Sequence, residues 1–525
     1  MRGADHVAKA LQNAGVETVF SLSGNQIMPV YDALLDVDIR VVHTRHEAAA
    51  VFMADAWAQV TGQPGIALLT AGPGFANALG AVYATSMAES PVLILSGDGP
   101  VSQDGTGSFQ EMAQVAMAQP VTKLSRRVTT TGKVAEEVED ALAVAQAGRP
   151  GPVHLALPAD VLTGKAEAEA KRNAGQDRTS PPTEPDIAAL GRWLGSLDRP
   201  LILAGPHLCR PRFAGLRADL AATTGAPVIP MESPRGLNDP ALGALRSAIA
   251  EADGVLLLGK KLDFTLGRGT ALQDGVPVAV VDAESAVLER VREAAPGPVG
   301  PVVLADPDLA ATALIAMSGR ARPDWVNTVS SALDKRAEGT GQTLNSPALC
   351  AAVRQALAKA PNPVLIADGG EIGQWAQAGI APPLRVINGP SGAIGGGLSY
   401  AIAAKLALPE ATVVLMSGDG SIGFHFAECE TALREGAAIT AVIGVDTLWN
   451  AEHQIQIRSF GADRAYGCGM DPRARYDLAA AGFGWHGAQV TEADGLPDAL
   501  AIAFGSDLPA MLDVRIEGLP APTLG

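Results

Sequence analysis

The sequence predicts an α/β protein of three domains, each built on a central parallel sheet. Short Val/Ile/Leu-rich runs such as PVLILSG alternate with longer Ala/Leu/Glu-rich segments, which is the βαβ rhythm of a parallel sheet covered by helices. The 525 residues, 47% of them apolar, are too many for one core and suit about three domains. Two polar stretches interrupt the rhythm and predict the borders between domains.

We predict an N-terminal domain over residues 1–165, a central α/β domain over 186–320 and a C-terminal domain over 345–525. The first border is the charged, Pro-rich stretch 165–185, which has no apolar period. The expected strands of the N-terminal domain lie within 16–20, 39–43, 65–70, 91–97 and 152–157. Those of the central domain lie within 200–206, 226–231, 254–259 and 277–282, and those of the C-terminal domain lie within 363–370, 385–397, 412–421, 439–446 and 510–516.

Charge and composition exclude several classes of function. A formal net charge of -17 argues against a nucleic-acid partner, which normally needs a basic face. The four cysteines are far apart without C-x-x-C spacing, so neither a disulfide framework nor a zinc site is predicted. No run of about 18 apolar residues and no leader-like N-terminus occur, so we expect a cytoplasmic protein without a membrane segment.

Gly-Asp-Gly follows an apolar run twice, at residues 97–99 and 418–420. A glycine-rich phrase precedes each copy, with Gly72 25 residues before Gly97 and Gly392 26 residues before Gly418. We therefore expect the N- and C-terminal domains to be one unit used twice, with both turns closing equivalent strands. The alternative is a coincidence among phrases common in α/β proteins.

Only the second copy has a suitable partner for binding a metal. Asp446 ends the next expected strand, 27 residues after Asp419, whereas the same distance from Asp98 leads to Ser125 in the basic context KLSRR. A divalent cation needs oxygen ligands from more than one element, and neighbouring parallel strands supply them at one edge. We predict that Asp419 and Asp446 bind metal, that a helix beginning near Ser421 faces phosphate, and that Asp98 shapes a turn.

With these residues in view, the whole chain resembles the thiamine-diphosphate (ThDP)-dependent enzymes, whose Gly-Asp-Gly is followed after about 25 residues by Asn-Asn. The resemblance implies related pyrimidine- and diphosphate-binding domains around a Rossmann-like central domain, with Mg²⁺ held by Asp419, Asp446 and the Leu448 backbone carbonyl. Val445-Asp446 departs from Asn-Asn. Because an aspartate supplies a similar oxygen and adds negative charge, we expect metal binding to survive.

TRHEAAAVFMADAWAQVTG resembles the family segment whose glutamate contacts N1′ of the aminopyrimidine, which corresponds to Glu47. A carboxyl group there shares its proton with N1′ and so promotes removal of the C2 proton, after which the cofactor acts as electron sink. The alternative is an acid placed only to favour a helix N-terminus. By the resemblance, further cofactor contacts fall on Pro73, Asn77, Gly370, Glu371, Gly392, Ile394, Gly418, Gly420 and Ser421.

The resemblance implies specific roles for Ile394 and Gly392, and Glu371 departs from it. Ile394 corresponds to the bulky residue under the bent cofactor, although alone it reads as a core residue, and the Gly392 carbonyl would accept from the 4′-amino group. Glu371 stands where acetolactate synthases often have glutamine, and an acid beside phosphate is unfavourable unless it turns away.

The N-terminal segments, including SFQEMAQVAMAQPVTK, resemble acetolactate synthase-like proteins, benzaldehyde lyase and the 2-hydroxyacyl-CoA lyases. Gln110 matches a glutamine beside the reacting carbon, although alone it reads as a surface residue, and Gln26 stands where some relatives have histidine. We expect a lyase or transferase that makes or breaks a carbon-carbon bond of a 2-oxo acid or 2-hydroxy ketone, as a decarboxylase or carboligase. The alternatives are a CoA-thioester enzyme, such as a 2-hydroxyacyl-CoA lyase or oxalyl-CoA decarboxylase, and a ThDP-fold binding subunit without turnover.

In the central domain, Lys260, Lys261 and Arg268 are candidates to contact the phosphate of FAD, ADP or CoA. A solvated basic edge is the preferred interpretation, so no nucleotide is predicted. Trp449, Asn450, His453 and Gln454 follow the metal segment and are expected to cap the substrate pocket. Because family members assemble each site from two chains, we expect a homodimer or homotetramer with active sites at the subunit interface, acting on a small molecule.

Overall fold

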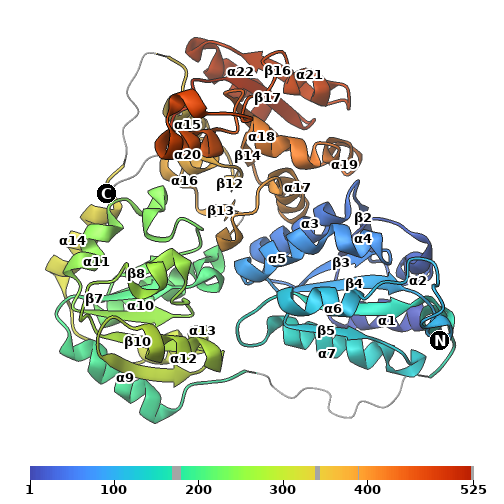
Figure 1. Ribbon diagram of the computed structural model, residues 1–525, viewed down its shortest axis with the longest axis horizontal. Helices are drawn as coiled ribbons and strands as arrows, with labels where there is room; N and C mark the ends of the chain where they lie inside the picture. Colours follow the sequence, from blue (N-terminus) through green and yellow to red (C-terminus); the bar gives the residue numbers. More distant parts are fainter. Residues whose placement is uncertain (168–178, 318, 337–342, 388, 522–525) are drawn as a thin grey trace.

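The computed structural model describes residues 1–167, 179–317, 319–336, 343–387 and 389–521, and it contains three parallel sheets in three lobes (Figure 1). The predicted α/β class with three parallel sheets is confirmed. Residues 168–178 of the predicted first border lie outside the described residues. Within the described ranges, every helix is too short or too polar to cross a bilayer.

The N-terminal sheet has the strand order β2-β1-β3-β4-β6-β5. Its strands are β1 (Thr18–Ser21), β2 (Arg40–His43), β3 (Gly65–Leu69), β4 (Val92–Asp98), β5 (Leu124–Arg127) and β6 (Val153–Pro158). Its helices are α1 (Gly3–Asn13), α2 (Met28–Leu35), α3 (Glu47–Thr61), α4 (Pro73–Asn77), α5 (Leu79–Ala88), α6 (Gln114–Ala118), α7 (Val134–Gln146) and α8 (Ala159–Thr163). Alternate residues of the buried strands enter two cores, with Leu93 and Leu95 in one and Ile94 in the other, because helices cover both faces.

The C-terminal sheet has the order β13-β12-β14-β15-β17-β16. Its strands are β12 (Val364–Ala367), β13 (Leu384–Ile387), β14 (Val413–Gly418), β15 (Thr440–Val445), β16 (His486–Val490) and β17 (Ala510–Arg515). Its helices are α15 (Ser346–Leu357), α16 (Glu371–Gly379), α17 (Gly397–Ala407), α18 (Asp419–Ile422), α19 (Glu428–Arg434), α20 (Asn450–Phe460), α21 (Tyr476–Ala481) and α22 (Leu496–Phe504). Numbered within its own domain, each sheet reads 2-1-3-4-6-5, so the two units share one topology.

The two Gly-Asp-Gly turns do not close equivalent strands, and that prediction is wrong. Asp98 ends β4, the fourth strand of its domain, whereas Asp419 follows β14, the third. The N-terminal counterpart of β14 is β3, and the C-terminal counterpart of β4 is β15, which leads into Asp446. The two Gly-Asp-Gly motifs are offset by one strand between the domains. Such a repeat arises because any buried strand followed by a turn favours the same residue types.

The central sheet has the order β11-β10-β9-β7-β8, with strands β7 (Pro200–Ala204), β8 (Val228–Pro230), β9 (Gly254–Leu258), β10 (Val278–Asp282) and β11 (Val299–Leu304). Its helices are α9 (Glu184–Ser196), α10 (Ala214–Thr224), α11 (Leu245–Glu251), α12 (Ser285–Ala294) and α13 (Pro307–Ile315), and α14 (Pro323–Leu333) follows them. From β7 the chain adds β8 on one side of the sheet and β9, β10 and β11 on the other. In such a sheet a ligand is expected to bind in the crevice at the carboxyl ends of β7 and β9.

Helices α3 and α17 join the N- and C-terminal domains within one chain (Figure 1). Phe52 of α3 packs edge-on against Tyr400 of α17, with ring centroids 5.4 Å apart. The buried Tyr400 hydroxyl donates to Asp55 at 2.9 Å. One continuous apolar core therefore spans the two domains.

Candidate functional site

A cavity of ≈ 70 Å³ opens at the carboxyl edge of the C-terminal sheet. Its walls include nine residues that the sequence analysis singled out: Gly370, Glu371, Ile394, Gly418, Asp419, Gly420, Ser421, Asp446 and Leu448. Four separate segments supply them, and these segments follow β12, β13, β14 and β15. The cavity thus collects the cofactor and metal contacts predicted on the C-terminal domain, apart from Gly392.

Asp419 and Asp446 lie together in this cavity, each anchored by backbone amides. Asp419 accepts from the Gly420 amide at 3.0 Å and the Thr447 amide at 2.8 Å. Asp446 accepts from the Leu448 amide at 3.1 Å. Burial, and next the negative charge of Asp446, raise the pKa of Asp419 to about 7. Two carboxylates in one partly dry site repel each other, which a bound cation relieves.

These residues fit a magnesium ion. Mg²⁺ prefers oxygen ligands, and the two carboxylates and the Leu448 peptide supply oxygens from two neighbouring strand ends. Among the described residues, no three His, Cys, Asp or Glu side chains gather into a metal-binding group. A third metal ligand from the protein at this site would therefore be a backbone oxygen. Asn450, predicted to cap the substrate pocket, lines this cavity and donates from Nδ2 to Asp446 at 2.9 Å, and Gln454 donates to Asn450 at 3.1 Å.

Two side chains that the sequence analysis missed hold the loop carrying Ile394. The buried Asp368 carboxylate accepts from the amides of Gly395 at 3.0 Å and Gly397 at 2.8 Å, and burial raises its pKa. His425 Nδ1 lies 2.8 Å from the Gly395 carbonyl oxygen. An acid directly after an expected strand was the available signal for Asp368, whereas nothing in the sequence linked His425 to Gly395.

Two other predicted residues of this edge lie differently. One Glu371 carboxylate oxygen accepts a hydrogen bond from the Ala521 amide, so the acid is engaged with the C-terminal segment while it borders the cavity. Gly392 has φ +68°, a left-handed conformation that favours glycine, and it does not line the cavity.

The N-terminal domain presents a second group around Glu47. This residue is 8% exposed and begins α3. Asn77 Nδ2 donates to its Oε2 at 3.1 Å, and Pro73 begins the short helix that ends at Asn77. A Cβ on Gly74 would lie 3.1 Å from Glu47 Oε1, so the carboxyl group packs closely on this turn. The structure therefore brings Glu47, Pro73 and Asn77 together.

The two glutamines predicted to face the substrate are hydrogen-bonded to each other. Gln26 Nε2 donates to Gln110 Oε1 at 2.8 Å, and Thr70, which the sequence analysis missed, donates to Gln26 Oε1 at 2.9 Å. Gln110 has φ +61°, an uncommon conformation for a residue with a side chain. The structure thus places Gln26 and Gln110 at one point on the N-terminal domain.

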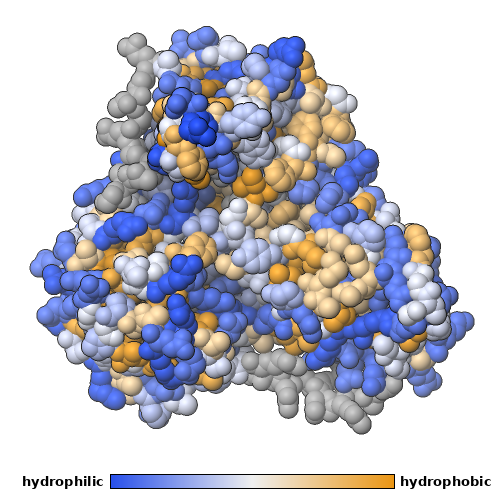
Figure 2. Space-filling model, viewed as in Figure 1, coloured by the Kyte–Doolittle hydropathy of each residue, from blue (hydrophilic) through white to orange (hydrophobic). Residues whose placement is uncertain are grey.

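The cavity at Asp419 does not extend to the N-terminal group around Glu47. The cavity at Asp419 is lined by residues between 370 and 452, and its ≈ 70 Å³ is far below the about 300–1,000 Å³ of typical cofactor sites. Phe109, next to Gln110, and Phe424, on the C-terminal domain, are both more than half exposed, and Figure 2 shows apolar side chains on the visible face of both domains. Each domain therefore presents a partial site.

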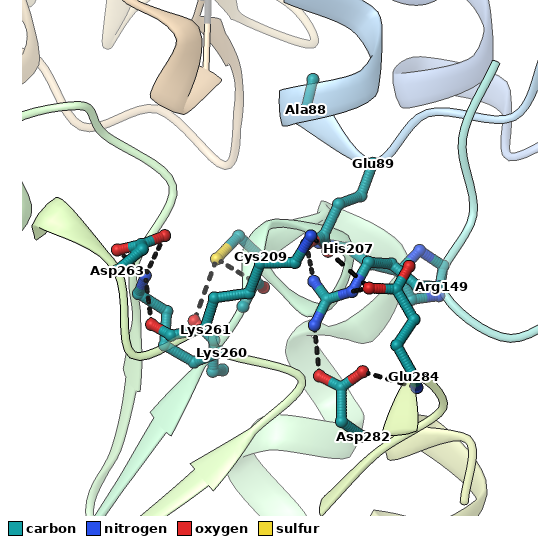
Figure 3. A network of polar contacts seen from close by, with 12 residues as sticks. Ala88, Glu89, Arg149, His207, Cys209, Lys260, Lys261, Asp263, Asp282 and Glu284 are labelled. Carbon is teal, nitrogen blue, oxygen red and sulfur yellow. Dashed lines mark hydrogen bonds and ion pairs between the residues drawn. The ribbon is translucent and has the colours of Figure 1, made fainter. Parts of the chain in front are cut away.

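Two of the three candidate nucleotide contacts of the central domain, Lys260 and Lys261, are engaged with other side chains (Figure 3). Lys260 is buried rather than part of a solvated basic edge, which corrects that interpretation, and its ammonium group donates to Thr265 at 2.6 Å and to Asp263 at 3.2 Å. Lys261 lies 3.6 Å from Glu284. Arg268 is exposed and remains the solvated cation expected from the sequence.

Arg149 of the N-terminal domain fills the crevice where the central sheet reverses its strand order. Its guanidinium binds Glu89 and Asp282 and lies 3.6 Å from Glu284 (Figure 3). The remaining cavity measures ≈ 10 Å³, enough for one water molecule at most. In this conformation the crevice joins two domains and has no space for a nucleotide.

Replacing Arg149 should destabilise the protein. We expect Arg149→Met to lower the free energy of unfolding by about 3–5 kcal/mol, because two buried carboxylates lose their cation. Urea titration followed by near-ultraviolet circular dichroism measures this change. Arg473→Met is the control, because the Arg473 side chain is 88% exposed. Equal stability of the two variants would contradict a role for Arg149 in joining the domains.

Comparison with known proteins matches two parts of the chain to family models. Residues 1–117 match the family model "Thiamine pyrophosphate enzyme, N-terminal TPP binding domain", and residues 368–514 match "Thiamine pyrophosphate enzyme, C-terminal TPP binding domain". A probable acetolactate synthase of Mycobacterium bovis is 31% identical over 97% of this chain and 95% of its own length. The human 2-hydroxyacyl-CoA lyase 2 is 30% identical over 92% of this chain and 84% of its own length.

Proposed function

This chain belongs to the thiamine pyrophosphate enzyme family, and from that premise we propose that it makes or breaks a carbon-carbon bond next to a carbonyl group. The proposed substrate is a 2-oxo acid or a 2-hydroxy ketone. The observation that carries the proposal is the gathering of Asp419, Asp446 and Ile394 around one cavity, together with a buried Glu47 on the N-terminal domain. When bound, ThDP supplies a carbon nucleophile and an electron sink.

The C-terminal residues bind and orient in this proposal. Asp419, Asp446 and the Leu448 carbonyl hold Mg²⁺, and Asn450 orients the Asp446 carboxylate through its hydrogen bond. The Gly418, Gly420 and Gly370 backbones border the same cavity. Ile394 lines the cavity in which the cofactor would bind, on a loop that Asp368 and His425 hold in place.

The N-terminal residues handle the proton and the substrate. Glu47 exchanges a proton with the pyrimidine N1′, and Asn77 orients the Glu47 carboxyl group. Gln26 and Gln110 offer amide groups to the polar atoms around the reacting carbon. A non-catalytic subunit would need none of these contacts, so the Glu47–Asn77 pair argues for turnover.

A CoA thioester is the second candidate substrate, because human 2-hydroxyacyl-CoA lyase 2 is 30% identical to this chain. The closed crevice at Arg149 favours the smaller substrates, since a nucleotide moiety would have to bind elsewhere.

A substrate panel tests the proposed function. The protein, loaded with ThDP and Mg²⁺, is incubated with 2-oxo acids, 2-hydroxy ketones, aldehydes and 2-hydroxyacyl-CoAs, and products are identified by mass spectrometry. We expect ThDP-dependent turnover of a 2-oxo acid or 2-hydroxy ketone. Turnover confined to CoA thioesters, with protection from heat by micromolar CoA, would favour the second candidate. No turnover with any class would overturn both.

We further propose that two chains complete each site, as a homodimer or within a homotetramer. The small cavity at Asp419 and the separate group at Glu47 support this arrangement, because each domain supplies one wall. Mixing defective chains provides a test. If Glu47→Gln and Asp419→Ala chains exchange partners, half of the dimers are mixed, and each mixed dimer has one intact site.

We expect such a mixture to recover about one quarter of the wild-type activity, since one site in four is intact. Steady-state assays after subunit exchange measure the recovery. A mixture of Glu47→Gln with Glu47→Ala is the control and should stay inactive. Failure of the first mixture, with exchange confirmed by native mass spectrometry, would show that each chain builds its own site.

A further inference from the structure

The loop 99–113, between β4 and α6, carries Gln110 and is ordered by its own contacts. The Glu111 carboxylate accepts from the amides of Gly105, Gly107 and Ser108 at 2.8–3.0 Å. Gln110 nevertheless has φ +61°, and such a conformation persists only where the surrounding structure imposes it. Contacts outside the loop must therefore hold it against the rest of the domain.

Gln114, at the end of the loop, is 1% exposed and uses both ends of its amide. Its Nε2 donates to the Gly97 carbonyl at 3.0 Å and to Asp98 at 3.1 Å, while its Oε1 accepts from the Gly72 amide at 3.2 Å. The groups around Nε2 can only accept hydrogen bonds, and the group beside Oε1 can only donate one. The amide therefore has one satisfactory orientation, and Gln114 connects the ends of β4 and β3.

Asp98 secures the other end of the loop. Its second carboxylate oxygen accepts from Arg127 Nε at 2.5 Å, and the same guanidinium donates to the Gly99 carbonyl at 2.9 Å and to Asp104 at 2.8 Å. Strand β4 is the counterpart of β15 in the C-terminal domain. Asp98 is the last residue of β4, and Asp446 comes directly after β15. Here a guanidinium and an amide stand where the related domain is proposed to hold a metal ion.

Gly72 connects this arrangement to Gln110. It has φ +57°, and a Cβ built there would lie 2.7 Å from the Gln110 carbonyl oxygen, so the two backbones touch. Gln110 in turn binds Gln26, which Thr70 holds. The segment from Thr70 to Asn77 therefore contacts the loop beside the substrate-facing glutamines and ends at the partner of Glu47.

We propose that Gln114, anchored on Asp98 and Arg127, is a positioning residue that sets the place of Gln110 and so controls how the enzyme engages its substrate. The first Gly-Asp-Gly turn thereby serves the substrate side of the site. This proposal rests on the proposed function, because it takes Gln110 to face the substrate. It goes beyond that function by assigning a role to three residues outside both partial sites.

The test uses Gln114→Met and Asp98→Asn in the full-length protein loaded with ThDP and Mg²⁺. Methionine fills a similar volume without hydrogen-bonding its neighbours, and asparagine keeps the shape of Asp98 but cannot accept from both Arg127 and Gln114. We expect kcat/KM to fall by about tenfold to a hundredfold, because a small displacement near the reacting carbon is costly. ThDP affinity should stay within about twofold, because Asp419, Asp446 and the other predicted diphosphate contacts lie on the C-terminal domain and are unchanged in both variants.

Amide hydrogen exchange of residues 99–113, followed by mass spectrometry, gives a readout that does not depend on turnover. We expect faster exchange in this loop in both variants and unchanged exchange around Asp419. Ser96→Ala is the matched control, because it removes a buried hydrogen bond to His154 from the same strand without touching the loop. Unchanged exchange and unchanged kcat/KM in both variants would overturn the proposal.

The two proposals fail in different ways. Wild-type protein without ThDP-dependent turnover would overturn the proposed function, while loop exchange would still decide whether Gln114 positions the loop. An active wild type with an equally active, equally protected Asp98→Asn would overturn only the inference, even if Gln114→Met failed to fold. A loss of ThDP affinity that matches the loss of kcat/KM would indicate general destabilisation and would also overturn it.

Discussion

Glu47→Gln should leave ThDP bound while slowing exchange of the cofactor C2 proton by about 10²–10⁴-fold. The amide keeps the size of the side chain and its contact with Asn77, but it cannot pass a proton to the pyrimidine N1′. Proton NMR of quenched samples after transfer to deuterated buffer measures the exchange rate. Fluorescence titration with ThDP measures binding in the same samples.

Asn77→Ala gives a graded comparison, since it removes the hydrogen bond that orients Glu47 but keeps the carboxyl group. We expect its exchange rate to fall by about tenfold, which is the size of effect expected from one lost hydrogen bond. If Glu47 served only as an acid at the start of α3, Glu47→Gln would cost about 0.3–1 kcal/mol of stability. Exchange at the wild-type rate would then contradict the proton role.

Asp419→Ala should abolish metal-dependent binding of ThDP, with the dissociation constants of Mg²⁺ and ThDP rising by more than about a hundredfold. The physical reason is that the cavity loses one of its two carboxylate ligands. Loss of a residue that only orients a metal ligand lowers metal affinity by about 10–100-fold, and loss of a residue that binds the metal directly should lower it more. Isothermal titration calorimetry of ThDP in the presence and absence of Mg²⁺ measures this loss.

Asp471→Asn is the control, because Asp471 is an exposed carboxylate of the same domain paired with Arg473. Asp446→Asn adds a second comparison. An amide oxygen remains at that position, so binding should weaken far less than in Asp419→Ala. Equal affinities in the wild type and Asp419→Ala would show that the metal site lies elsewhere.

Much of the C-terminal site was predictable because its residues carry short-range signals. Asp419 follows a buried strand, Asp446 ends the next one, and parallel strands bring their carboxyl ends to one edge. The structure places both in one cavity with Ile394, as the order of segments implied. Glu47 was predictable from its segment, and its contact with Asn77 accords with that assignment.

Other residues could not be predicted because their partners are distant in the chain. Arg149 meets Asp282 133 residues later, and His425 meets the Gly395 carbonyl group 30 residues earlier. His425 gave no local signal at all. Which buried polar groups pair depends on how helices and loops pack, and composition or periodicity carries no information about that packing.

By itself, the sequence determined the α/β class, the three parallel sheets and the carboxylates at the C-terminal edge, because strand periodicity and turn chemistry are local. The cofactor family followed from the resemblance of its motifs to a known family. Only the tertiary structure decided which strands correspond between the related domains, that Arg149 closes the central crevice, and that Asp98 contacts Gln114 and Arg127. These are questions of which side chain reaches which neighbour across the fold. Two identical Gly-Asp-Gly phrases therefore have different surroundings, and their chemistry follows from those surroundings.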